Sequence, residues 1–184
     1  MAEGFKLAGD MDSWNVYRKL AVVCDVTELF ITHHMTACRT VDQMRQAARS
    51  GKQNVVEGIG DEAASFEICY KLVGVARGSL RELREDYKDY LRQHKLERWQ
   101  PGDERLTAWA QYAKTPFEIA EFTAKCETKR AEVIANVMIT VICQLDAALA
   151  SIMKGQLEEF ERTGGIKEKL TQLRLQWRRK NLGY

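Results

Sequence analysis

Apolar residues recur at intervals of three and four along most of this chain, and this spacing predicts amphipathic helices. Four long segments carry the pattern: from a cap at Asp12 or Ser13 to about Thr36, and about 40–57, 62–93 and 129–162. The inward positions of the first are Val16, Leu20, Val23, Thr27, Phe30 and Ile31. Those of the last run from Val133 through Val141 and Leu145 to Leu157. Four such segments predict an all-α fold, a four-helix bundle.

The connection between the third and fourth long helices is unusually elaborate. Turn residues make Trp99–Asp103 its clearest loop. Shorter helices are predicted over 104–113 and 117–128, separated at Thr115–Pro116 because proline disfavours helix in the residue before it. The bundle therefore has a decorated third connection.

Three segments organise the whole chain: a mobile leader over 1–11, the bundle over 12–165 with its insertion at 100–128, and a basic C-terminal helix over 166–184. The C-terminal helix is amphipathic through Leu170, Leu173 and Trp177, which predicts that it docks on the bundle. Six of its residues are basic and one is acidic, so it carries most of the excess positive charge.

Composition agrees with a helical protein of the cytoplasm. The 184 residues include only two prolines, and 45% are hydrophobic. No uninterrupted apolar run reaches the roughly 18 residues of a membrane span, and the N-terminus lacks the order of a secretory signal. Five cysteines, at 24, 38, 69, 126 and 143, are predicted to be reduced and structural, with Cys69 and Cys143 on apolar faces.

The segment Gln43–Leu83 is rich in small residues for a helical region. Gly58-Ile59-Gly60 predicts the end of one helix, and Asp61 a cap for the next. Within the following helix, Gly74, Gly78 and Ser79 predict close packing or a partner, since glycine in a helix costs about 0.5–1 kcal/mol relative to alanine.

The same segment resembles a known family. The residues are Gln43-Met44-Arg45-x-Ala47-Ala48-x-Ser50, Asn54-x-x-Glu57-Gly58 and Ala76-x-Gly78-Ser79-Leu80-x-Glu82-Leu83. They are similar to the four-helix-bundle proteins encoded in intervening sequences of bacterial large-subunit ribosomal RNA genes, and to the accessory variability proteins of diversity-generating retroelements. Ser50-Gly51-Lys52-Gln53-Asn54 and the region from Gln144 to Ile166 resemble the longer branch of that family, which carries a suffix region.

The resemblance implies a bacterial, cytoplasmic, cyclic homo-oligomer, a pentamer, that binds RNA or DNA and is not an enzyme. It further implies an accessory role, with a reverse transcriptase as the partner. An alternative is a structural or protein-interaction scaffold whose charged stripes form subunit interfaces.

Basic residues on the third helix form one stripe: Arg77, Arg81, Arg84, Lys88, Arg92 and Lys95. An acidic stripe of Glu82, Glu85, Asp86 and Asp89 lies beside it. Three interpretations stay open. The face is solvated, with Glu85–Lys88 and Asp89–Arg92 pairs, or it binds phosphates, or it meets the acidic stripe of the next subunit.

Two further basic sets are candidates for phosphate contacts. Arg45, Arg49 and Lys52 share a face of the second helix. Arg174, Arg178 and Arg179 surround Trp177 in the C-terminal helix, where the indole could stack on a base. The alternatives are surface arginines near an interface, and a docked helix with its cations outward.

Candidate metal and catalytic patterns are weak. His33, His34 and Cys38 lie close in sequence, but no second pair of ligands has finger-like spacing, so helix-end polar residues are the better interpretation. The sequence carries no phosphate-binding loop and no nucleophile elbow. We therefore expect no metal, no cofactor and no enzymatic activity.

Overall fold

The computed structural model describes residues 15–36, 38–60, 66–164 and 166–183. Every regular element in these ranges is a helix: α1 (Asn15–His34), α2 (Arg39–Gly60), α3 (Phe66–Gln93), α4 (Glu104–Tyr112), α5 (Ile119–Glu127), α6 (Ala131–Thr163) and α7 (Ile166–Leu182). The predicted leader over 1–11 and the predicted Asp61 cap lie outside the described residues. The all-α prediction is confirmed.

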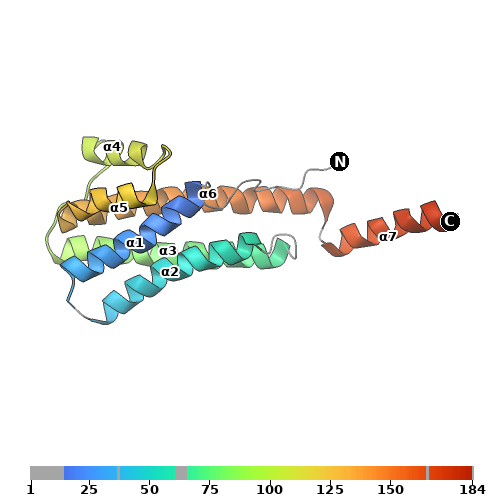
Figure 1. Cartoon of the computed structure of the whole chain (residues 1–184), viewed down its shortest axis with the longest axis horizontal. Helices are drawn as coiled ribbons and strands as arrows, with labels where there is room; N and C mark the ends of the chain where they lie inside the picture. The colour runs from blue at the N-terminus through green and yellow to red at the C-terminus, as the bar shows by residue number, and fades with distance from the viewer. Residues whose placement is uncertain (1–14, 37, 61–65, 165, 184) are drawn as a thin grey trace.

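Four long helices pack side by side around the core. α2 lies between α1 and α3, and α6 contacts both α3 and α1 (Figure 1). The two helices of the 100–128 insertion cover one flank, with α5 on α1 and α4 on α6. α7 extends beyond the far end of α6 and lies apart from the other helices (Figure 1).

The periodicity of the sequence locates most of the core. All six inward positions predicted for α1 are buried, as are Val137, Val141 and Leu145 of α6. Leu157, predicted to face inward, is 42% exposed, whereas Gln156 beside it is buried and donates to the sulfur of Cys69 near the start of α3. Ala131–Arg162 is long and apolar enough to cross a membrane by length and composition, and 61% of its most apolar window is buried inside the molecule.

The closest helix contact joins α2 to α3 through two glycines. A Cβ atom at Gly51 would lie 2.9 Å from Cδ2 of Leu80, and one at Gly58 would lie 3.3 Å from the carbonyl oxygen of Cys69. The run Gly58-Ile59-Gly60 was predicted to end the helix, and α2 does end at Gly60, although Gly58 itself is still helical. Gly58 is small because α3 passes there.

The glycines of α3 do not make a comparable contact within the chain. Gly78 has no heavy atom within 4 Å of an added Cβ, and Gly74 meets only the end of the Met153 side chain at 3.8 Å. Ser79 shares a hydrogen bond with Ser50 at 2.9 Å. The close packing predicted at Gly74 and Gly78 is therefore not found among the described residues, and the glycines of α2 make it instead. A partner at Gly74 and Gly78 stays a prediction.

Several polar contacts fix α1 to segments far away in sequence. Lys19 donates from Nζ to Oε1 of Gln144 at 2.7 Å, and Arg18 donates to the carbonyl oxygen of Phe117 at 2.9 Å. Inside the core, the hydroxyls of Thr27 and Tyr87 are 3.0 Å apart. These contacts tie α1 to α3, to α6 and to the start of the insertion's second helix.

The C-terminal helix does not dock as predicted. α6 ends where Gly164 adopts a φ of 69°, and its amide donates to the carbonyl oxygen of Phe160 at 2.8 Å. α7 then projects away, and Leu170, Leu173 and Trp177 are 48%, 59% and 61% exposed. The periodicity showed correctly that one face is apolar, but no other helix in the described ranges covers it.

Candidate functional site

The charged residues of α3 divide along two different helix contacts. Arg77 donates from Nε to Oδ1 of Asp146 on α6 at 2.7 Å, and Arg81 donates to Oδ2 of the same carboxylate at 3.1 Å. The basic stripe therefore follows the line where α3 meets α6. The acidic residues Glu82 and Asp86 line hollows beside α2 instead. This separation explains why the basic and the acidic residues of α3 form two separate stripes in the sequence.

We call Arg77, Arg81, Arg84 and Lys88 the basic edge. Glu85 accepts hydrogen bonds from Lys88 at 2.7 Å and from Arg84 at 3.3 Å. Asp146 accepts hydrogen bonds from Arg77 and Arg81. Four cations thus share two carboxylates, and the edge keeps a surplus of two positive charges. The Glu85–Lys88 and Asp89–Arg92 contacts expected for a solvated face are both present.

Asp146 holds the edge together, although it could not be selected from the sequence on separate grounds. Burial alone would raise the pKa of its carboxyl, but hydrogen bonds from Arg77 and Arg81 outweigh burial and hold that pKa below its usual value. Asp146 is thus an ionised anchor between two guanidinium groups. Its only signal was that it is the one carboxylate between Glu132 and Glu158, in the most apolar part of the fourth predicted helix.

The α2 cations lie along the contact with α1. Arg45 forms a two-pronged pair with Glu28, at 2.8 and 3.0 Å, and also meets Asp42 at 3.2 Å. Lys52 lies 5.7 Å from the centroid of the Tyr17 ring. Arg49 is exposed between them. Neighbouring carboxylates therefore offset much of this set's charge.

The tail cations form a third, separate group. Arg174, Arg178 and Arg179 are exposed on α7, and no ion pair holds them in the described part of the chain. The structure does not bring the three predicted basic sets together. One follows the α3–α6 contact, one follows the α1–α2 contact, and one projects beyond the end of α6.

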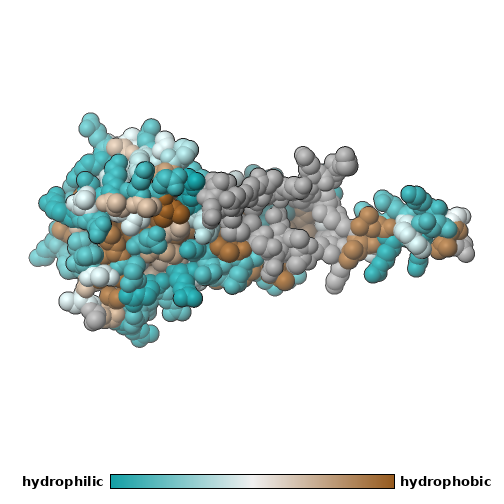
Figure 2. All heavy atoms as spheres, viewed as in Figure 1, coloured by the Kyte–Doolittle hydropathy of each residue, from teal (hydrophilic) through white to brown (hydrophobic). Residues whose placement is uncertain are grey.

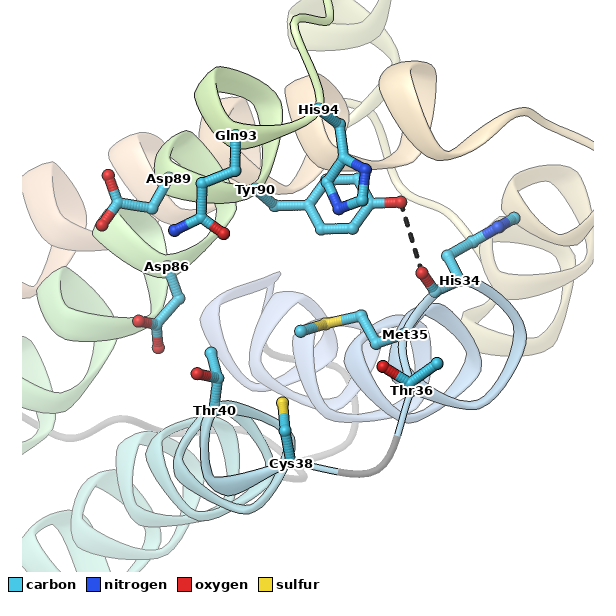
Figure 3. Close-up of a pocket in the computed structure, with 10 residues that line it drawn as sticks. All are labelled: His34, Met35, Thr36, Cys38, Thr40, Asp86, Asp89, Tyr90, Gln93 and His94. Atoms are coloured by element: carbon cyan, nitrogen blue, oxygen red, sulfur yellow. Dashed lines mark hydrogen bonds between the residues drawn. The ribbon is translucent and has the colours of Figure 1, made fainter.

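A groove with acidic residues runs along the α2–α3 contact, and we call it the acidic groove. It contains two hollows that share Asp86. One, of about 410 Å³, is lined by Gln43, Gln46, Ala47, Ser50, Ser79, Glu82 and Asp86. The other, of about 340 Å³, lies between the end of α3 and the α1–α2 connection, where Met35 and Tyr90 line it beside Asp86 and Asp89 (Figure 3).

Two carboxylates of the acidic groove lack counter-ions. No ion pair joins Glu82 or Asp86 to the residues that the structure describes. Burial raises the pKa of Asp86, and repulsion from Asp89 and Glu82 adds to the rise. The groove is thus a place where a cation would relieve repulsion.

The histidine and cysteine side chains are not all dispersed, because His34, Cys38 and His94 line the hollow beside Met35 and Tyr90 (Figure 3). Cys69 and Cys126 are buried, but Cys143 is exposed, and its sulfur lies 3.8 Å from Nη1 of Arg84. The prediction of an apolar face for Cys143 is therefore wrong. His34 is the last residue of α1. Among the described residues, no three histidine, cysteine, aspartate or glutamate side chains are placed so that they could hold one metal ion.

A comparison of the chain with protein-family models, with curated proteins and with solved structures finds no match.

Proposed function

We propose that this protein is a non-enzymatic, homo-oligomeric accessory protein that binds the backbone of RNA or DNA along its basic edge. Its scaffold is a four-helix bundle of α1, α2, α3 and α6, since each of these helices contacts two of the others in turn. The supporting observation is that four cations share only two carboxylates along the α3–α6 contact, which leaves a surplus of two positive charges. A ring of five subunits and a reverse transcriptase partner belong to the proposal through the family resemblance.

Arginine geometry suits such a role. Arg81 is 52% exposed, and it donates to Asp146 through Nε and Nη2, so its Nη1 is left for a phosphate. Guanidinium forks match phosphate oxygens and give affinity without reading base sequence. Shared carboxylates also hold the side chains in position before a nucleic acid arrives.

The salt dependence of binding tests this proposal. Arg81→Gln should reduce the slope of log affinity against log salt by about 0.9 if it loses one duplex phosphate, or by about 0.7 on a single strand. Sequence preference should not change. Arg130→Gln, which removes one exposed cation outside the basic edge, is the control and should leave the slope unchanged.

The scaffold function is the second candidate, and the exposed apolar residues of α7 favour it. If Arg81→Gln dissociates the oligomer and any nucleic-acid binding is insensitive to salt, the basic edge is a subunit contact. The nucleic-acid proposal then gives way to the scaffold. An unchanged slope in an intact oligomer also rejects the basic edge as a phosphate site.

A further inference from the structure

Among the described residues, no other helix covers the apolar stripe that α7 presents. Leu170, Leu173 and Trp177 follow one face at intervals of three and four residues, and Arg174 and Arg178 flank them. Figure 2 shows hydrophobic atoms of α7 beside hydrophilic ones, on a helix that stands apart from the rest of the molecule. An isolated helix of 17 residues is marginal in water, so contacts outside this chain would stabilise α7.

The acidic groove has complementary charge and a matching length. Glu82, Asp86 and Asp89 follow one another at intervals of four and three residues, and Leu170, Arg174 and Trp177 have the same spacing. At about 1.5 Å per residue, both sets span roughly 10 Å. The hollow beside Asp89 also offers apolar contacts, since Met35 and the Tyr90 ring lie around it (Figure 3).

We propose that α7 of one subunit docks in the acidic groove of a second subunit, with Trp177 in the hollow beside Met35 and Tyr90. Running parallel to α3, it places Arg174 against Asp86 and Arg178 against Asp89. The apolar stripe then leaves water, Asp86 gains a guanidinium partner, and Asp89 gains a second one beside Arg92. The inference rests on the assembly part of the proposed function and not on nucleic-acid binding.

The chain's own groove is out of reach. α6 has 33 residues and is roughly 50 Å long. The hollow lies at the α1–α2 connection, whereas α7 starts at the opposite end of the molecule and points away from it (Figure 1). The contact must therefore join two copies. Because tail and groove are different surfaces, each copy can give one and receive one, as in a ring.

A charge-reversal cycle in the full-length chain tests the pairing. Arg174→Glu and Asp86→Lys should each weaken self-association about tenfold or more, measured by sedimentation velocity, and the double variant should recover most of it. Arg179→Glu is the matched control. It makes the same charge change on the opposite face of α7, and should leave self-association within about threefold of the original.

A photo-crosslinker in place of Trp177 locates the contact directly. In a mixture of isotopically light and heavy subunits, crosslinked peptides should join position 177 to residues 34–40 or 86–94 of the other isotope. Crosslinks confined to one isotope, or to other surfaces, overturn the inference. Equal loss of RNA binding in Arg174→Glu and Arg179→Glu, with the mass of the oligomer unchanged, also overturns the inference. α7 is then an arm that binds nucleic acid. The Arg81 result is independent of both outcomes.

Discussion

The hydroxyl groups of Thr27 and Tyr87 form a polar contact inside an otherwise apolar core. Both side chains are fully buried, and burial raises the pKa of the Tyr87 phenol, so the pair is neutral. Thr27 was correctly predicted to face inward from periodicity. Its partner could not be predicted, because spacing along one helix contains no information about which residue of another helix lies opposite.

Tyr87→Phe should destabilise the protein by about 1–3 kcal/mol, since it leaves the Thr27 hydroxyl buried without its partner. The measurement is the free energy of unfolding in urea. Tyr90→Phe is the control, because the hydroxyl of Tyr90 makes a longer bond of 3.3 Å to the carbonyl oxygen of His34 in a less buried position. Equal effects of the two changes would contradict this account.

Asp146→Asn should cost about 1–2 kcal/mol at pH 7, because a charged acceptor of two guanidinium bonds is lost. The folded pKa of Asp146 is lowered, so its contribution is complete above the unfolded value of about 3.9 and disappears as pH falls through the folded value. The difference between original and variant should therefore shrink below about pH 4.

The control for this effect is Glu158→Gln on the same helix. Glu158 pairs with Lys154 at 3.7 Å in an exposed position, so its loss should cost less than about 1 kcal/mol. Unfolding measured at several pH values checks both variants. A difference for Asp146→Asn that persists undiminished in acid would show that packing, and not charge, dominates there.

At the scale of the helices, glycine has two different roles. Gly51→Ala should destabilise by about 1–3 kcal/mol, because its Cβ would press on the fully buried Leu80. Gly78→Ala, on an open surface, should stabilise by up to about 1 kcal/mol through helix propensity. Thermal unfolding of the two variants checks these opposite signs. A stabilising Gly51→Ala would mean that Leu80 can move.

Helix positions could be predicted from the sequence far better than helix neighbours. The loop at Trp99–Asp103 and the insertion helices follow from local signals, such as turn residues and proline. Gly58 shows the limit of local signals, because a glycine that ends a helix and a glycine that admits another helix look the same in sequence. The exposed face of α7 was misjudged for a related reason, since periodicity does not identify the partner.

At the scale of the whole molecule, assembly is the property most open to test. Light scattering at micromolar concentration should give a mass above one subunit, because the tail and the acidic groove are complementary and each copy carries both. Salt should lower that mass, since the contact is partly ionic. A single-subunit mass at low salt would overturn the assembly and the docking of α7 together.

The long-range contacts of α1 also set an order of events during synthesis. The hydrogen bond from Lys19 cannot form until Gln144, which is 125 residues later in the chain, has been synthesised. At roughly 5–20 residues per second, the ribosome needs roughly 6 to 25 seconds to cover that distance. α2 and α3 follow each other directly and can pair early, while the side of α1 that will meet α6 stays uncovered. α1 is made before α2, α3 and α6 but is among the last of these helices to be enclosed, so a chaperone has most time to act on it.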